Sequence, residues 1–143
     1  MTTENNWPEP LPVAQVRIAR PTDRLAEVVR FYAEGLGLRE LFRADGHAGY
    51  SVVMLGLPGA AYHLEFTSHV DGSPGDAPSA EHLLVFYFDG AADQQRVAAR
   101  LREFGAPEVT PENPYWTEHG ALAFADPDGW QVLLLPQPVF RSQ

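Results

Sequence analysis

One short segment, Tyr62 to Thr67, carries the residues best suited to chemistry. It reads Tyr-His-Leu-Glu-Phe-Thr, and alternation along a strand would place His63 and Glu65 on one face and the apolar residues on the other. A carboxylate in a cleft can bind a divalent cation, act as a base or accept a hydrogen bond. Glu65 is therefore the candidate catalytic residue. The alternative is structural, because the same alternation places Arg17 on the cleft side, where it would form an ion pair with Glu65.

Potential ligands also recur at a nearly constant distance along the chain. Gln15 lies 50 residues before Glu65, and His82 lies 51 residues before Leu133. The first three of these side chains can ligate a metal or move a proton, and an imidazole both binds transition metals and titrates near neutral pH. A leucine side chain does neither. The sequence thus predicts three polar positions and one apolar position in an otherwise repeated pattern.

Hydrophobic periodicity predicts the elements that position these residues in the first half of the chain. A strand from Val13 to Arg20 precedes a helix whose apolar residues recur at helical spacing from Leu25 to Leu36. Thr22 or Asp23 is expected to cap this helix, and a Gly-Leu-Gly sequence ends it. Three short strands are expected to follow, near Arg39 to Arg43, Tyr50 to Leu55 and Tyr62 to Thr67.

The second half repeats this order after a linker, residues 68–79, that is rich in Gly, Pro and Ser. An aromatic and β-branched strand from His82 to Phe88 precedes a helix from Asp89 to Phe104. In that strand, Leu84 and Phe86 lie two and four residues after His82, so all three are expected to share the face that lines the cleft. Three further strands are expected near residues 108–110, 121–125 and 130–135.

The order βαβββ therefore occurs twice, which predicts an α+β fold. We expect a single domain over residues 1–143, with module 1 at about 12–67 and module 2 at about 80–136. In each module the helix would cover one face of a four-stranded sheet. Bringing the two uncovered faces together would form an incomplete barrel with a cleft, lined by the first and last strands of each module.

Aromatic residues gather in the second half and indicate a binding surface. Flat rings can hold a planar ligand or a cation, and Phe86 is one candidate for such a contact. Tyr115 and Trp116 are adjacent in a predicted loop from Pro111 to Glu118, where two large rings are hard to bury together. They are candidates for a lid or for an interface, while core packing is the simpler role for other aromatic residues.

Composition excludes several classes of function. Cysteine is absent from the 143 residues, which excludes disulfides, thiolate nucleophiles and cysteine metal sites. The net charge of −9 disfavours nucleic-acid binding and attracts cationic ligands. We find no glycine-rich phosphate loop, no Ser-His-Asp arrangement, no membrane-spanning apolar run and no signal-peptide pattern. A cytoplasmic protein without nucleic-acid or membrane partners is expected.

Several short motifs, in this order, resemble a known superfamily. They are Val29-Arg30-Phe31-Tyr32 followed by Gly35-Leu36-Gly37-Leu38, the strand His63 to Thr67, and Asp126-Pro127-Asp128-Gly129. With the repeated βαβββ order they resemble the vicinal oxygen chelate superfamily over about residues 12–136. Its members include glyoxalase I, methylmalonyl-CoA epimerase, extradiol dioxygenases, and fosfomycin-resistance and bleomycin-resistance proteins. The resemblance implies the glyoxalase/bleomycin-resistance fold.

The resemblance also implies where a metal would bind. Ligands of metal-binding members come from the first and last strands of each module, and the matching positions here are Gln15, Glu65, His82 and Leu133. Glutamate is the usual residue at the fourth position. Its replacement by leucine removes an anionic ligand and a carboxylate that would shuttle a proton, unless His63 or Gln131 takes its place.

Two functions from different classes follow. The first is a metal-free, homodimeric protein of bleomycin-resistance type that binds a small aromatic or cationic molecule in its cleft. The second is a metal-dependent lyase or isomerase of glyoxalase type, with Zn, Ni, Mn or Fe held by Gln15, Glu65 and His82. For the first function the expected ligand-binding residues are Arg17, His63, Glu65, His82, Phe86, Tyr115 and Trp116.

Overall fold

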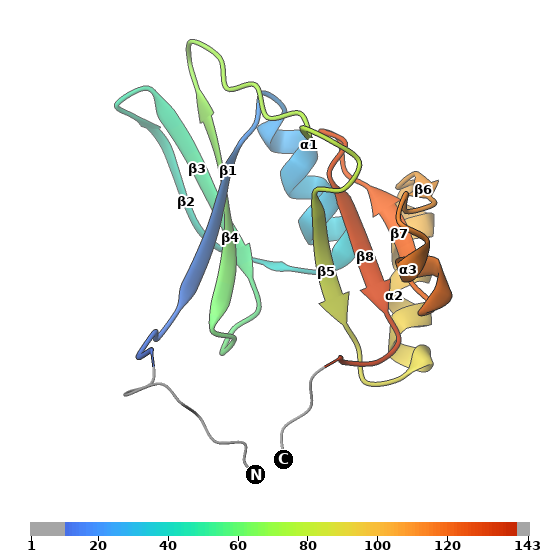
Figure 1. The fold of residues 1–143 in the computed structure, drawn as a ribbon. Coiled ribbons are helices and arrows are strands. Elements are labelled where there is room, and N and C mark those ends of the chain that lie inside the picture. Colours follow the sequence, from blue (N-terminus) through green and yellow to red (C-terminus); the bar gives the residue numbers. More distant parts are fainter. Residues whose placement is uncertain (1–10, 140–143) are drawn as a thin grey trace.

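The chain folds into two modules with the same order of strands, which a computed structural model describes over residues 11–139 (Figure 1). Module 1 contains β1 (Val16–Pro21), α1 (Leu25–Arg30), the π-helix η1 (Phe31–Leu36), β2 (Arg39–His47), β3 (Tyr50–Gly56) and β4 (Tyr62–His69). Module 2 contains β5 (Leu83–Tyr87), α2 (Ala91–Phe104), β6 (Glu108–Val109), α3 (Pro114–Glu118), β7 (Leu122–Ala125) and β8 (Gln131–Leu135). Within residues 11–139, no helix has the length and apolar character needed to cross a membrane.

Each module forms a four-stranded sheet. Sheet A has the strand order β1-β4-β3-β2, and sheet B has the corresponding order β5-β8-β7-β6. In both sheets the first strand pairs in parallel with the last, and the remaining pairs are antiparallel. The predicted α+β fold with two βαβββ modules is therefore confirmed. Over the described residues the two sheets remain separate and do not close into a barrel.

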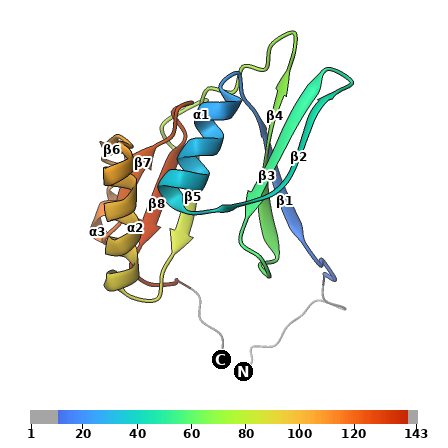
Figure 2. The same cartoon turned by 180° about the vertical axis from the view of Figure 1, so that it is seen from behind.

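One hydrophobic core joins the modules through their helices. α1 and η1 lie between the two sheets, while α2 covers sheet B and packs against η1 (Figure 2). Apolar side chains in strands and helices drive this packing because their burial removes nonpolar surface from water. The core contains Val28, Phe31 and Tyr32 of α1 and η1, Leu55, Leu64 and Phe66 of sheet A, Leu101 of α2, and Phe124, Val132 and Leu134 of sheet B.

Each sheet also has a free face, which is the face opposite this core. Alternation and register place Arg17, Met54 and Glu65 on the free face of sheet A, and Val85 and Leu133 on the free face of sheet B. Because the covered faces share the core, the two free faces point away from each other within one chain. This arrangement differs from the sequence-based expectation that the two free faces meet to form a cleft.

The beginning of the first helix differs from the prediction. Arg24, rather than Thr22 or Asp23, directly precedes α1 and makes no side-chain capping bond. Thr22 still supports this end, because its hydroxyl accepts a hydrogen bond of 2.9 Å from the amide of Arg24. The carboxylate of Asp23 instead accepts a hydrogen bond from the amide of Ser73 in the linker. Asp23 therefore ties the linker to module 1.

The second half of this helix is wider than an α-helix. In η1 the carbonyl of Tyr32 accepts hydrogen bonds from the amides of both Gly37 and Leu38, at 3.1 and 2.9 Å. Gly35 of η1 faces α2, where a Cβ atom would lie 3.2 Å from carbons of Leu101 and Phe104. A glycine at this position therefore allows close contact between the helices of the two modules.

A short helix replaces part of the predicted loop in module 2. In α3, proline occupies the first turn, and Asn113 caps the helix by accepting a hydrogen bond of 2.9 Å from the amide of Tyr115. This helix lies over the free face of sheet B, where Trp116 packs against Ala123, Leu133 and Leu135. The Asn-Pro pair was the sequence signal for this helix.

Candidate functional site

A broad groove lies on the free face of sheet A. Its volume is about 620 Å³, and it is formed by strands β2, β3 and β4. Most of its surface is apolar, and Phe42 is 51% exposed and Tyr50 48% exposed along it. A groove of this kind can hold a flat organic molecule. The lining residues are Phe42, Ala44, His47, Tyr50, Val52, Met54, Glu65 and Thr67.

Arg17, His63 and Glu65 form a connected group beside this groove. Arg17 of β1 stands in register with His63 of β4, and its Nε donates a hydrogen bond of 2.9 Å to Nε2 of that ring. Its Nη1 lies 3.2 Å from Oε1 of Glu65. The ion pair that strand alternation predicted is therefore present. Metal ligation was one of the roles predicted for Glu65, but here its carboxylate is paired with the guanidinium of Arg17.

The other two predicted polar ligands lie just outside the strands. Gln15 is exposed and directly precedes β1. His82 directly precedes β5, and its Nδ1 is hydrogen-bonded to the hydroxyl of Ser79 at 2.8 Å. Its ring and that of Trp130 are arranged edge to face, with centroids 5.4 Å apart. No group of three His, Asp or Glu side chains suited to a metal ion occurs within residues 11–139.

The two faces of β5 and β8 carry different residues from those expected. Leu133 does lie on the free face, but it is fully buried beneath α3. Leu84 and Phe86 pair with Val132 and Leu134 and pack against the shared core on the α2 side. The interpretation that Leu84 and Phe86 face the cleft is therefore wrong. Phe86 packs against the core, which gives no support to its predicted contact with a ligand.

Tyr115 and Trp116 line a second, smaller pocket of about 220 Å³. Their rings meet edge to face with centroids 5.1 Å apart, and the ring of His119 lies 4.1 Å from that of Tyr115. Tyr87 of β5 also lines this pocket. Trp116 also covers sheet B, so its role is at least partly structural. Whether these residues touch a ligand stays a prediction.

Comparison with known proteins identifies the family. The model of the YycE-like N-terminal domain matches residues 16–67, and that of the YycE-like C-terminal domain matches residues 81–135. The chain belongs to the YycE-like family. A YycE-like relative, the uncharacterized protein YycE of Bacillus subtilis (strain 168), is 46% identical over 122 residues, which cover 85% of this chain and 87% of the relative.

Solved structures show the fold of this YycE-like chain. A crystal structure of a YycE protein of unknown function from Bacillus subtilis has 43% identity and a TM-score of 0.84, covering 92% of this chain and 95% of that one. A glyoxylase/bleomycin resistance protein/dioxygenase domain from Frankia sp. EAN1pec has 25% identity and a TM-score of 0.65, covering 91% and 100%. An antibiotic binding protein from Streptomyces sp. CB03234 has 23% identity and a TM-score of 0.63, covering 90% and 98%. The chain therefore has the predicted glyoxalase/bleomycin-resistance fold and is a member of the vicinal oxygen chelate superfamily.

The residues of this YycE-like chain do not fit the metal site that its superfamily implies. The fourth ligand position is a buried leucine, Leu133. The carboxylate of Glu65 is paired with Arg17, and the imidazole of His82 is bonded to Ser79. A divalent cation at Glu65 would have to displace a guanidinium that carries the same sign of charge.

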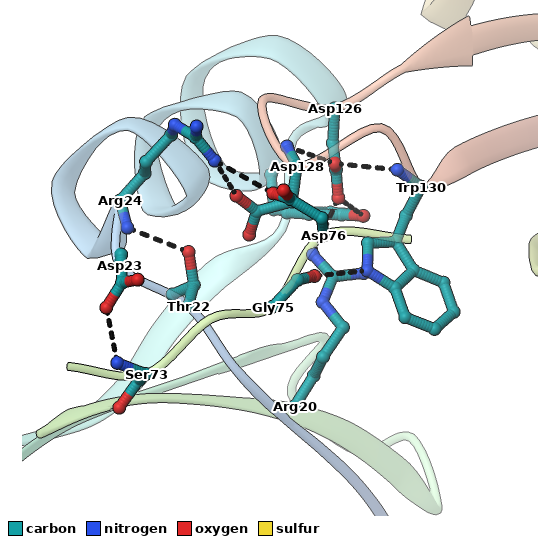
Figure 3. A network of polar contacts seen from close by, with 11 residues as sticks. Arg20, Thr22, Asp23, Arg24, Ser73, Gly75, Asp76, Asp126, Asp128 and Trp130 are labelled. Carbon is teal, nitrogen blue, oxygen red and sulfur yellow. Dashed lines mark hydrogen bonds and ion pairs between the residues drawn. The ribbon is translucent and has the colours of Figure 1, made fainter. Parts of the chain in front are cut away.

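A polar network lies at the junction of the modules (Figure 3). The sequence did not predict it. Asp126, in the turn before β8, is buried, and its Oδ2 accepts hydrogen bonds from Arg20 at 2.6 Å and from the hydroxyl of Tyr32 at 2.7 Å. Its Oδ1 accepts the amides of Asp128 at 2.8 Å and Trp130 at 3.0 Å. The carboxylate thus ties the turn of module 2 to β1 and η1 of module 1.

Further contacts extend this network to the linker. Arg24 donates hydrogen bonds to Asp128 at 2.8 Å and to Asp76 at 3.1 Å, and the indole N–H of Trp130 donates to the carbonyl of Gly75 at 2.8 Å (Figure 3). Burial, together with the nearby Asp126 carboxylate, raises the pKa of Tyr32 well above its usual value. The network therefore has a structural role at the junction, outside the groove. The sequence signal for it was the pair of carboxylates in Asp-Pro-Asp-Gly.

Proposed function

We propose that this YycE-like protein binds a small aromatic molecule, without a metal, in the groove on the free face of sheet A. The observation that carries the proposal is the pairing of Glu65 with Arg17 beside an apolar groove of about 620 Å³. Ligand pockets commonly measure roughly 300–1,000 Å³ and combine apolar walls with a few polar groups. The groove matches that description.

The side chains of the groove favour a flat, apolar ligand. Phe42 and Tyr50 offer exposed ring surface, and Met54 offers a polarizable side chain that adapts to ring edges. Glu65 and Thr67 supply polar atoms along one side. Likeness to the antibiotic binding protein from Streptomyces supports the proposal only through the fold, because the identity is 23%.

We also propose that the protein acts as a homodimer. In one chain the groove has a floor, sheet A, while the free face of sheet B points elsewhere. A second copy is the partner that brings an equivalent module against the exposed rings of Phe42 and Tyr50. Light scattering on the full chain is expected to give twice the mass of the monomer. A monomer at high micromolar concentration would contradict this part of the proposal.

Fluorescence of N-phenyl-1-naphthylamine, which increases in apolar surroundings, tests the binding site. We expect the probe to bind in the presence of EDTA. Its affinity should not change when EDTA is removed and Zn²⁺ is added. Phe42→Ala should weaken binding by about tenfold because a ring contact is lost. Tyr87→Ala, which shortens an exposed aromatic side chain of β5 outside the groove, is the matched control and should leave the affinity unchanged.

Two results would contradict the proposed function. The first is loss of binding after EDTA treatment with recovery on adding a stoichiometric divalent metal, because that result would assign the ligand to a metal site. The second is equal weakening by Phe42→Ala and Tyr87→Ala, which would place the probe outside the groove. Thermal unfolding of both variants checks that each one is folded.

A further inference from the structure

Arg17 is held in place beside the groove by side chains from two strands. Its Nε donates to His63 at 2.9 Å and its Nη1 lies 3.2 Å from Glu65, both on β4. Its Nη2 lies 3.5 Å from the sulfur of Met54 on β3. An arginine that is fixed before a ligand arrives loses less conformational entropy on binding it. The guanidinium is thus arranged for recognition.

The exposure of the three partners shows which one a ligand would meet. The side chain of Arg17 is 49% exposed, whereas that of Glu65 is 16% exposed and His63 is 6% exposed. The carboxylate and the imidazole therefore lie beneath the guanidinium. A guanidinium also has more N–H donors than these contacts use. Donors of Arg17 remain for a group that approaches from the groove.

Local charge and overall charge favour opposite ligands at this site. The net charge of −9 attracts cations at long range, but salt screens such fields over about 8 Å at physiological ionic strength. Within the groove, the Glu65 carboxylate is already neutralised by Arg17, which is the more exposed member of the pair. Contact with the guanidinium therefore decides the preference, and it favours an anionic oxygen.

We propose that Arg17 binds the anionic group of the ligand, so that the groove accepts aromatic carboxylates. This inference rests on the proposed function, and it replaces the expectation of a cationic ligand. The planar guanidinium suits the two oxygens of a carboxylate, and the apolar floor of sheet A suits the attached ring. Glu65 and His63 hold the guanidinium in place and do not contact the ligand charge.

Three naphthalene compounds of similar shape test this preference. They are 2-naphthoate, 2-naphthamide and 2-naphthylmethylammonium, each titrated against bound N-phenyl-1-naphthylamine. We expect 2-naphthoate to bind at least about tenfold more tightly than 2-naphthamide, because the carboxylate offers the guanidinium a full negative charge and two acceptor oxygens, whereas the amide offers one neutral carbonyl. Arg17→Gln should remove this difference by weakening the binding of 2-naphthoate far more than that of 2-naphthamide.

Arg43→Gln is the matched control. Arg43 lies on β2 of the same sheet, pairs with Val53 of the covered face and is bonded to Glu40. Its replacement changes the net charge by the same amount, and the preference for 2-naphthoate should persist. Equal losses in Arg17→Gln and Arg43→Gln would overturn the inference, because they would indicate a long-range charge effect. Tighter binding of 2-naphthylmethylammonium would overturn it as well.

The outcomes separate this inference from the proposed function. If 2-naphthamide and 2-naphthoate bind equally in the groove, the inference fails and the aromatic binding function stands. If neither compound nor the fluorescent probe binds, both fail. NMR of the wild-type chain provides a readout that needs no variant: the Nε–H signal of Arg17 should shift on adding 2-naphthoate and stay in place on adding 2-naphthamide. An unmoved signal with bound 2-naphthoate would overturn the inference.

Discussion

Sheets A and B have the same strand order, but their free faces differ in composition and cover. The free face of sheet A is open and carries Arg17 and Glu65 above an apolar groove. The free face of sheet B carries aliphatic residues, and α3 covers it through Trp116. A repeated fold therefore need not repeat a site. On the free faces of the described strands, the Arg17–Glu65 ion pair belongs to module 1, and the equivalent surface of module 2 forms a small apolar core.

Glu65 and Leu133 occupy equivalent positions in the two modules, and exchanging their residue types should give the largest change in stability. Leu133→Glu would place a carboxylate in a fully buried apolar cluster and should reduce the free energy of unfolding by about 5 kcal/mol. The reverse change, Glu65→Leu, should cost less than about 1 kcal/mol, because its partner Arg17 is half exposed and becomes solvated. Urea unfolding of both variants measures the contrast.

Leu133→Glu also tests whether a carboxylate at the fourth ligand position creates a metal site. We expect Leu133→Glu to bind no stoichiometric Zn²⁺ or Ni²⁺, since the new carboxylate would lie beneath α3 and away from the free face of sheet A. Elemental analysis after loading and dialysis checks this expectation. A folded Leu133→Glu variant with bound metal would show that the two free faces come together, and the contrast between the modules would then fail.

Sequence patterns predicted the site of module 1 more accurately than that of module 2. Alternation placed Arg17 and Glu65 on one face of adjacent strands because both lie within paired segments of their strands. His82 lies one residue before β5, where alternation no longer fixes the direction of a side chain. Alternation also defines two faces without showing which one a helix covers. For Leu84 and Phe86, the position of α2 in three dimensions determined the answer.

The turns before the last strand of each module provide a second contrast. In module 1 this turn contains the exposed Pro58-Gly59, whereas in module 2 it contains the buried Asp126. Asp126→Ala should lower the free energy of unfolding by about 3 kcal/mol, because the charge of Arg20, whose side chain is only 15% exposed, would lose its partner. Urea unfolding measures the loss. Asp76→Ala, at the exposed end of the same network, is the control and should have no measurable effect.

The sequence indicated that Asp126 lies in a turn but not what it contacts. Its partners Arg20 and Tyr32 are 106 and 94 residues away along the chain. No periodic pattern links such distant residues, because the contact depends on how the two modules pack. If Asp126→Ala unfolds at the same urea concentration as the wild type, the hydrogen bonds of Asp126 to Arg20 and Tyr32 do not contribute to holding the modules together.

Removing the cover of sheet B should have a moderate effect. Trp116→Ala would uncover Leu133 and Ala123, so that the free face of sheet B resembles that of sheet A. Because Trp116 is only partly buried, the expected loss of stability is about 2 kcal/mol, below that for a fully buried tryptophan. Tyr115→Ala, whose side chain is more exposed, should cost less. Hydrogen exchange should show faster opening of β7 and β8 in Trp116→Ala alone, and equal exchange in both variants would contradict a covering role for α3.

The smallest effect contrasts two tyrosines, Tyr32 at the junction and Tyr62 at the start of β4, whose pKa values are raised to different extents. Tyr32 has a pKa raised well above its usual value of 10.0, first by burial and then by the Asp126 carboxylate. A raised pKa in the folded state gives stability that is complete below pH 10 and is lost as the pH rises toward the folded-state pKa, because the unfolded chain ionises first. Wild-type stability should therefore fall above pH 10, and Tyr32→Phe should fall less steeply, although its stability at neutral pH is lower. Tyr62 is only partly buried, and burial raises its pKa less than that of Tyr32, so Tyr62→Phe should keep a slope closer to that of the wild type. Urea unfolding from pH 9 to 11 measures these slopes, and equal slopes in all three proteins would remove Tyr32 as the cause.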